Sequence, residues 1–370
     1  MAAATPADAT LHIRTFGQSP LSSARGRFGA LWARPITRAV AKALLTIYVT
    51  STITFVLIRL MPGNPVELKI DELMQQSQMS YADAAALTSG LFDIDLGAPI
   101  HEQYVEYLGN LARGNLGNSF LSRGTTVMSI ILAVLPWTLF AVGTGLLLSF
   151  VVGIALGLVA AYRRDGALDH AVTTGGSVIS SVPNYLVALL IVLIFGIQLR
   201  WIPITQMRGA FSPGSVPGFS PEFVGDVLFH ASLPMTVFFL THVGLWILSM
   251  RSATLAVLEE DHVTVARARG LPDGRITTAY VGRNAVLPLV SQFAIAAGAV
   301  VGGAVVIEQI FVYQGVGLRL VSSVNARDYP VMQGIILMTT AAVIIANLVA
   351  DLLYSRLDPR IGRAGGASGT

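Results

Sequence analysis

Hydrophobic residues gather in long runs along the chain, and shorter polar segments separate these runs. A helix needs about 20 mostly apolar residues to cross the hydrocarbon core of a membrane. Six runs meet this length, and they cover residues 43–60, a stretch within 130–162, and residues 171–199, 227–250, 285–307 and 331–354. Only Arg59 and Asp351 place a charge inside these limits, and each lies near a span end, where it can reach the interface. The pattern predicts an all-α integral membrane protein with six transmembrane helices.

The composition narrows the class of protein further. Hydrophobic residues make up 53% of the chain and charged residues 12%, whereas about 25% of the residues in a soluble domain are charged. This balance excludes an ordinary soluble enzyme, and it excludes an intrinsically disordered chain, which needs low hydrophobicity and high charge. The chain has no cysteine, so disulfides, thiolate metal sites and cysteine nucleophiles are excluded as well.

The distribution of Lys and Arg predicts the orientation in the membrane. If the N-terminus is cytoplasmic, most of the Lys and Arg residues lie on the cytoplasmic side, where membrane proteins usually carry them. This distribution favours both termini in the cytoplasm. It also explains the positive net charge without binding to nucleic acid. The first apolar run is long and lacks a cleavage site, so it is expected to be an uncleaved anchor. The expected segments are a disordered cytoplasmic tail (1–33), the first transmembrane helix (34–61), an extracytoplasmic segment (62–128), a five-helix domain (129–358) and a cytoplasmic tail (359–370).

The extracytoplasmic segment has two features of its own. The prolines at positions 62 and 65 flank a glycine and are expected to stop the first helix. Tyr104, Tyr107, Leu108 and Leu111 recur at helical spacing, which predicts an amphipathic helix on the membrane surface or against the helix bundle.

The cytoplasmic loop over residues 252–287 is the most informative polar segment. Acidic residues open the stretch 259–271 and arginines close it, which suits the dipole of a short helix. Gly270 is a candidate C-cap and Pro272 a stop signal, and a second short helix is expected over residues 275–283. The loop is thus predicted to be two short helices at the membrane surface. A solvated basic connector is the alternative, but the small Ala266 and Ala268 favour close approach to another surface.

Small residues mark the faces where helices are expected to meet. Gly298 and Gly302 in the fifth span are four residues apart, Gly303 follows, and Gly153 and Gly157 repeat the spacing in the second span. Such faces allow helix backbones to approach closely. We favour helix packing over substrate contact as the role of these glycines. In the fifth span the same residues serve both roles if two subunits meet there around a pathway.

The sequence lacks the motifs of an energy-coupling enzyme. There is no Walker-type nucleotide loop, no Gly-Lys pair, no HExxH or GxSxG motif, and no acidic residue in the middle of a span. His230 and His242 have no carboxylate or second histidine at ligand spacing and are interpreted as structural. No catalytic, cofactor-binding or metal-binding residue is therefore predicted, and a protein that pumps without them must take its energy from a partner.

Several stretches together resemble a known family, the permease subunit of dipeptide/oligopeptide-type ABC importers, and in particular the first of its two paralogous permeases. The resemblance rests on residues 60–65, 99–120, 261–271 with 283–288, 302–317, 328–334 and 351–360.

This resemblance implies a fold, partners and a mechanism. The fold is that of a type I importer permease (MetI-like), with residues 129–358 as the transmembrane domain and 252–287 as the coupling loop. The implied partners are a second permease subunit, two ATPase subunits that bind ATP and Mg²⁺, an extracytoplasmic substrate-binding protein and the lipid of a bacterial cytoplasmic (inner) membrane. The residues that it places at the ATPase contact are Asp261, Val263, Ala266, Arg267, Ala268, Arg269, Gly270 and Leu271.

The match to the family is not complete. The general importer motif begins Glu-Ala-Ala, whereas Thr264, Val265 and Ala266 stand here, so Glu259, Glu260, Asp261, Arg267 or Arg269 are the candidates to replace the motif glutamate. Di- or oligopeptides are the implied substrates, with a nickel chelate or an oligosaccharide as alternatives. Two other classes stay open: an ion-coupled secondary carrier, which the lack of mid-span acids disfavours, and a membrane scaffold or receptor that transports nothing.

Overall fold

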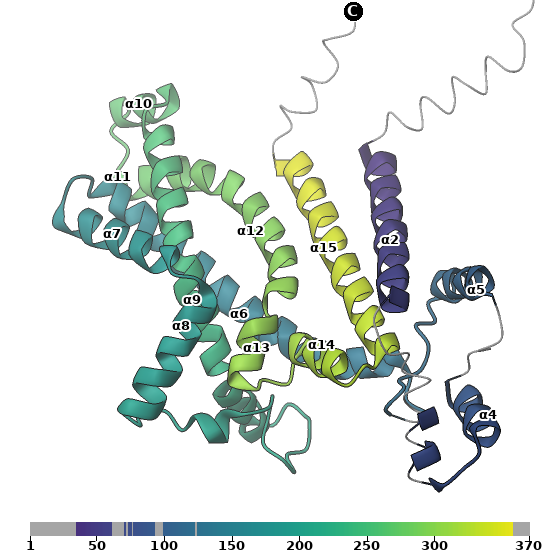
Figure 1. Ribbon diagram of the computed structural model, residues 1–370. Coiled ribbons are helices and arrows are strands. Elements are labelled where there is room, and N and C mark those ends of the chain that lie inside the picture. The colour runs from purple at the N-terminus through teal and green to yellow at the C-terminus, as the bar shows by residue number, and fades with distance from the viewer. Residues whose placement is uncertain are drawn as a thin grey trace, which may run out of the picture. The chain divides into compact units, whose positions relative to one another are not determined.

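The computed structural model describes residues 35–60, 70–71, 73–75, 77–92, 99–122 and 124–357 (Figure 1). It divides into two units, residues 1–48 and 49–370. The described part of the first unit is the beginning of α2 (Pro35–Leu60), and the second unit holds the remaining helices. The predicted tails at 1–33 and 359–370, and the turn at 61–65, lie outside the described residues.

Most of the described residues are helical, and their one β feature is an isolated bridge between Asn118 and Thr126. After α2 the helices are α4 (Tyr81–Phe92), α5 (Ile100–Ala112), α6 (Val127–Tyr162), α7 (Ala167–Ser181), α8 (Asn184–Leu190), the π-helical η1 (Ile191–Gln198), the short η2 (Ile204–Met207), α9 (Pro221–Leu258), α10 (Asp261–Ala268), α11 (Asp273–Arg275), the π-helical η3 (Ile276–Gly282), α12 (Arg283–Gly303), α13 (Val305–Phe311), α14 (Val316–Asn325) and α15 (Tyr329–Leu357).

Four single helices are long and apolar enough to cross a membrane. They cover Val40–Leu57, Val127–Tyr162, Pro221–Leu258 and Tyr329–Ala350, and they correspond to the first, second, fourth and sixth predicted spans. Many of their large apolar side chains point outward, including Leu139, Leu147 and Val151 on α6. An apolar surface of this extent suits lipid, because soluble proteins rarely expose contiguous apolar patches beyond a few hundred Å².

The third predicted span, over residues 171–199, is not one continuous helix. Helices Ala167–Ser181 and Asn184–Gln198 meet at an angle of 96°. The cause is Pro183, which has no backbone N–H and forces the preceding Val182 into an extended conformation (φ −85°, ψ 125°). The apolar stretch is therefore a broken span or a re-entrant loop.

The fifth predicted span, over residues 285–307, ends earlier than expected. Helix α12 stops at Gly303, and α13 and α14 follow as a second pair that bends by 84°. We call the segment Val305–Asn325 the α13–α14 corner; the sequence did not predict it. If each bent pair counts as one span, the described residues hold up to six spans by length and composition.

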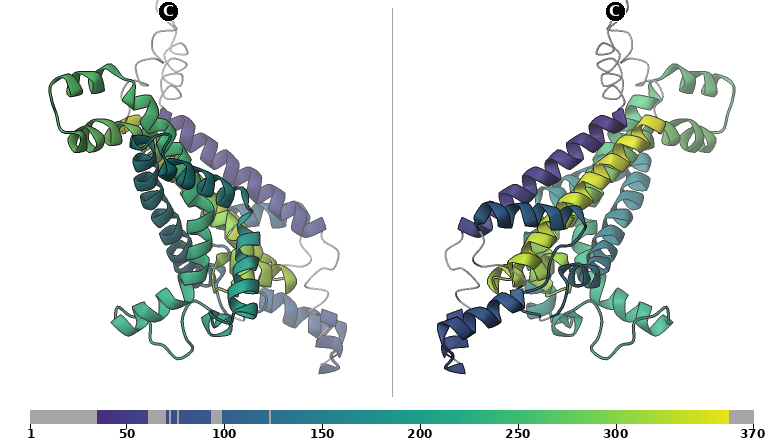
Figure 2. Two further views of the ribbon diagram at one scale, coloured as in Figure 1. Left: turned by 90° about the vertical axis from the view of Figure 1, so that its left-hand side faces the viewer. Right: turned by 90° about the vertical axis from the view of Figure 1, so that its right-hand side faces the viewer.

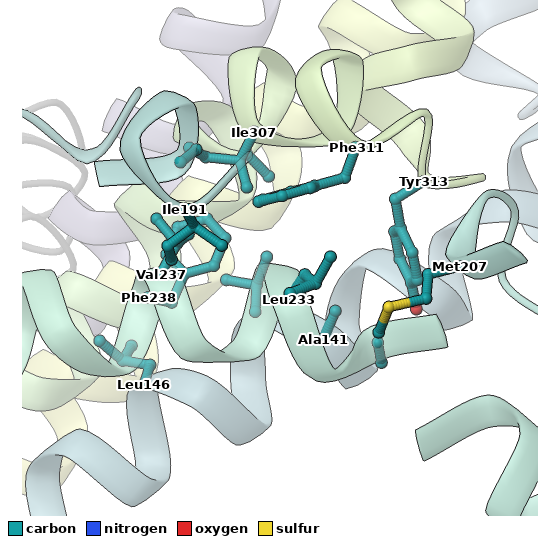
Figure 3. Close-up of a cluster of buried hydrophobic side chains, with 14 of the residues drawn as sticks. Ala141, Leu146, Ile191, Met207, Leu233, Val237, Phe238, Ile307, Phe311 and Tyr313 are labelled. Carbon is teal, nitrogen blue, oxygen red and sulfur yellow. The ribbon is translucent and has the colours of Figure 1, made fainter. Parts of the chain in front are cut away.

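The centre of the second unit is an apolar core. It joins α6, α9, η1 and α13, with Phe238, Ile307 and Phe311 among its buried residues (Figure 3). Helices α6 and α9 approach closely because glycine replaces larger side chains: a Cβ on Gly153 would overlap Trp246, and one on Gly157 would lie 2.5 Å from the Ile247 carbonyl oxygen. The predicted packing role of these two glycines is confirmed.

The amphipathic helix predicted around Tyr104 is present as α5. Its Tyr104 hydroxyl lies 2.7 Å from Thr52 Oγ1, and the Tyr107 ring stacks on Phe55 at 5.5 Å between centroids. Helix α5 thus packs on the part of α2 that belongs to the second unit. Packing against the helix bundle was one of the two placements that the sequence predicted for it.

Candidate functional site

Helix α10 is a short polar helix that directly follows the end of α9. Glu260 is its N-cap residue, Asp261 lies in the first turn and Arg267 in the last. Negative charge near the N-terminus and positive charge near the C-terminus both interact favourably with the helix dipole. The predicted short helix and its charge order are confirmed.

Gly270 ends this helix as the sequence indicated. Its φ is +70°, its N–H donates to the Arg267 carbonyl (2.9 Å), and the Leu271 N–H donates to the Ala266 carbonyl (3.3 Å). This pair of hydrogen bonds is a Schellman motif, in which glycine is preferred because it adopts a positive φ without steric cost. The C-terminal end of α10 therefore has a defined geometry.

One face of α10 is buried against its own chain. Val263 and Ala266 are buried in a cluster with Met250 and Val257 of α9 and with Ile276 of η3. These two predicted contact residues therefore attach the helix to α9 and η3.

Most of the remaining residues of α10 are exposed. Five of the predicted contact residues are among them or lie just beyond the helix end: Asp261, Arg267, Ala268, Arg269 and Gly270. Two of these residues, Asp261 and Arg269, also line a cleft of about 420 Å³ together with His262, Val265, Ala266, Leu271 and Tyr280. The cleft has an apolar floor with an acid and a base at its edge, which is a surface that another protein can bind. Figures 1 and 2 show α10 beyond the end of α9, next to α11.

Helix α10 is also attached to the helix that follows it. Asn284 Nδ2 lies 3.2 Å from His262 Nε2 and donates to the Tyr280 carbonyl at 2.9 Å, while His262 Nδ1 lies 3.1 Å from Glu260 Oε2. A displacement of α10 would therefore be transmitted to α9 through the chain and to α12 through this hydrogen bond and the buried cluster.

The second short helix expected over residues 275–283 is not a separate element. Residues 273–303 form one helical stretch through α11, η3 and α12, because Ile276 and Arg283 both keep helical dihedral angles. A π-helical segment accommodates an extra residue per turn without ending the helix. Pro288 lies inside α12 and does not precede it.

The other predicted residues lie away from α10. Gly298 of α12 faces α15, where an added Cβ would lie 2.5 Å from Ala346 Cβ. Gly302 and Gly303 form the end of α12, next to the α13–α14 corner. Whether they also line a pathway stays a prediction.

A buried carboxylate in the α13–α14 corner was missed. Glu308 is 1% exposed, and Oε2 accepts from the Gly317 N–H (2.7 Å) and the Leu318 N–H (3.1 Å). Thr138 of α6 donates to Oε1 (2.6 Å) and accepts from the Val316 N–H (2.8 Å). These side chains satisfy the unpaired N–H groups at the start of α14. The signal in the sequence was a lone acid in an apolar run, but it fell just beyond the assumed end of the fifth span.

A buried acid, Asp169, and a partly buried one, Asp226, have partners that the sequence did not reveal. Asp169 of α7 pairs with Arg251 of α9 at 2.6 Å. Asp226 lies one turn before His230, and its Oδ1 is 3.3 Å from His230 Nδ1, so the expectation that His230 has no carboxylate partner is wrong. His242 Nδ1 lies 3.0 Å from the Phe238 carbonyl, which agrees with a structural role. Among the residues described, no group of three or more His, Asp or Glu could hold a metal ion.

Comparison with known proteins places these features in one family. Residues 153–363 match the family model described as "Binding-protein-dependent transport system inner membrane component". A "Putative peptide permease protein" of Brucella suis biovar 1 (strain 1330) is 36% identical over 307 residues, which is 83% of this chain and 92% of that protein. The "Di/tripeptide transport system permease protein" of Pseudomonas aeruginosa (strain UCBPP-PA14) is 34% identical over 337 residues, covering 88% of this chain and 98% of that protein. The "Oligopeptide transport system permease protein" of Bacillus subtilis (strain 168) is 31% identical over 326 residues, covering 87% and 98%.

Proposed function

This chain belongs to the family of binding-protein-dependent transport system inner membrane components, and from that premise we propose that it is one of two permease subunits of an ATP-driven peptide importer of the bacterial cytoplasmic membrane. The three relatives reported above are each named for transport of peptides, dipeptides, tripeptides or oligopeptides. The four single membrane-length helices and two bent pairs supply the apolar walls that such a subunit needs.

The energy comes from outside the chain in this proposal. The sequence has no Walker-type nucleotide loop, so ATP and Mg²⁺ are bound by two separate ATPase subunits. A substrate-binding protein on the extracytoplasmic side delivers the peptide, and a second permease subunit completes the pathway. The permease itself performs no chemical step.

The contact with the ATPase subunits is the exposed face of α10. The observation that carries this proposal is the two-sided character of the helix: Val263 and Ala266 anchor it to α9 and η3, whereas Arg267, Ala268 and Arg269 are open to a partner. Because only two residues separate α10 from α9, and His262 of α10 is hydrogen-bonded to Asn284 of α12, a movement imposed on α10 reaches both helices. Rigid-body rocking of packed helices is a common way to convert such a movement into alternating access.

Cysteine labelling tests the docking directly. The natural chain has no cysteine, so Ala268→Cys introduces a single thiol on the exposed face of α10. Maleimide labelling in inside-out membrane vesicles is expected to be fast when the two permeases are expressed alone and slow when the ATPase subunits are present. Arg163→Cys, on the exposed turn between α6 and α7, is the control for general accessibility. Equal labelling of Ala268→Cys with and without the ATPase subunits would contradict the docking site.

A charge reversal tests coupling. In proteoliposomes with the complete transporter, Arg267→Glu is expected to abolish the ATPase stimulation by the binding protein and the uptake of a radiolabelled dipeptide, while insertion and assembly are retained. Arg163→Glu makes the same change on another exposed turn and is expected to have little effect. Unchanged uptake and unchanged ATPase stimulation in Arg267→Glu would count against α10 as the coupling element. Uptake in energised vesicles that lack the ATPase subunits would instead favour an ion-coupled carrier.

A further inference from the structure

Helices α7 and α9 are joined by a buried, two-pronged ion pair. Arg251 Nε donates to Asp169 Oδ1 at 2.6 Å and Arg251 Nη2 donates to Asp169 Oδ2 at 2.7 Å. The Asp169 side chain is 2% exposed and that of Arg251 is 27% exposed. Two parallel bonds between a guanidinium and a carboxylate fix both the distance and the orientation of the helices that carry them.

Asp169 also fixes the turn between α6 and α7. Its Oδ2 accepts from the Asp165 N–H at 3.1 Å, where Asp165 has a φ of +62°. The N-cap residue of α7 is Gly166, which has no side chain to perform this role. One carboxylate therefore holds the α6–α7 turn and α9 together.

Further along the same interface the contact is between backbones. A Cβ added to Gly244 of α9 would overlap the Gly176 carbonyl and the Ser180 hydroxyl of α7. Glycine contacts of this kind allow close approach of two helices. The ion pair adds to this close backbone packing a charged contact whose two hydrogen bonds have a fixed direction.

The position of the ion pair connects it with α10. Arg251 lies in the last turns of α9, which ends at Leu258, and α10 begins at Asp261. We infer that Arg251 and Asp169 are positioning residues that keep α7 in register with α9 when α10 is displaced. The broken span formed by α7 and α8 then moves with the coupling helix during transport. This inference rests on the proposed docking of α10 to the ATPase subunits.

Distance measurements between spin labels test it in the complete transporter. Thr174→Cys on α7 and Ala256→Cys on α9 are both exposed positions in a chain without natural cysteines. In the parent protein the label-to-label distance is expected to be the same in the nucleotide-free and the vanadate-trapped state. In Arg251→Lys and in Asp169→Asn it is expected to change on trapping by about 2 Å or more, the scale of helix shifts in such transitions.

The variants are chosen so that the protein still folds. Arg251→Lys keeps a cation opposite the buried carboxylate but loses the bidentate geometry. Asp169→Asn keeps the shape of the side chain. Asp165→Asn is the matched control, since Asp165 is exposed, pairs with the exposed Arg164 at 3.6 Å, and asparagine also tolerates a positive φ. This control is expected to behave as the parent.

Three results would overturn the inference. If the distance in both variants stays the same on trapping while Ala268→Cys is still protected by the ATPase subunits, the ion pair has no positioning role and the docking proposal stands. If the variants change the distance equally in both nucleotide states, the pair is only structural. If Ala268→Cys is not protected at all, the docking proposal fails and this inference fails with it.

Discussion

Helix α10 and the α13–α14 corner lie at opposite ends of the helical stretch that contains α12, and they use polar residues in opposite ways (Figure 1). On α10 the charged side chains of Asp261, Arg267 and Arg269 are exposed, and the apolar side chains attach the helix to its own chain. In the corner the charged side chain is buried, and Glu308 is itself the attachment. The difference separates a surface that is free to bind a partner from a joint that holds the fold.

The contrast distinguishes charged residues outside the lipid from charged residues buried in the helix bundle. Charge that lies outside the lipid costs little and is free to serve recognition. Charge buried in the helix bundle must be fully hydrogen-bonded, because an unsatisfied polar group there costs several kcal/mol. Substitutions in the two regions should therefore differ in what they damage, transport coupling in one case and folding in the other.

Removal of the buried carboxylate is the strongest test. Glu308→Ala leaves the Gly317 and Leu318 N–H groups and the Thr138 hydroxyl without an acceptor, so the free energy of unfolding is expected to fall by about 3 kcal/mol. Thermal unfolding in detergent, followed by tryptophan fluorescence, measures the change. Glu308→Gln keeps one acceptor oxygen and should lose less, and Glu222→Ala, at an exposed acid in the first turn of α9, should change little. A midpoint for Glu308→Ala equal to that of Glu222→Ala would remove the basis of the comparison.

An added methyl group tests how tightly the corner is built. A Cβ on Gly315 would overlap the Glu308 carboxylate, although the backbone at this position (φ −117°, ψ −175°) suits any residue. Gly315→Ala is expected to lower the free energy of unfolding by about 2 kcal/mol, a typical cost of overpacking. Gly143→Ala on α6, where nothing lies within 4 Å of the new methyl group, is the control and should not destabilise. The same unfolding assay measures both variants, and a harmless Gly315→Ala would show that the carboxylate can move aside.

The sequence predicted α10 well because every signal for it is local. The acids lie at the N-terminal end of α10, and the arginines, Gly270 and Pro272 lie at its C-terminal end, so every signal falls in or next to the helix itself. It could not indicate which face of the helix is buried, since Val263 and Ala266 contact residues on α9 and η3 that depend on the tertiary fold. Only the structure therefore shows which of the predicted contact residues are buried and which are exposed.

The α13–α14 corner could not be predicted for the opposite reason. Glu308 is satisfied by Thr138, which lies 170 residues away in the chain, and a hydropathy pattern holds no information about that pairing. The same limit explains Asp169 and Arg251, which are 82 residues apart. The length and composition of the apolar runs were enough to predict the long helices. The break at Pro183 was missed because the length of the apolar run was given more importance than the proline within it.

A backbone test at the end of α10 is expected to have a smaller effect. Gly270 has a φ of +70° and open space around it, so Gly270→Ala meets no clash and pays only the cost of a left-handed conformation, about 1 kcal/mol. Gly270→Asn should cost less, because asparagine tolerates this conformation better. Gly274→Ala lies four residues further in equally open space without a positive φ and is the control. The unfolding midpoint measures the cost, and a loss as large as that of Gly315→Ala would mean that the α10 region is also a structural joint.

The smallest change in stability is expected on the exposed face of α10, where the functional effect should be greatest. Arg267→Glu removes a favourable charge from the last turn of the helix, which costs about 0.5 kcal/mol because the residue is exposed and the dipole is screened. The unfolding midpoint should therefore stay close to that of the parent protein and of Arg163→Glu. If the same variant loses ATPase stimulation while its stability is kept, the defect lies in recognition and not in folding. A fall in stability as large as that of Glu308→Ala would mean instead that the exposed face of α10 also holds the fold, and the distinction between the two regions would be lost.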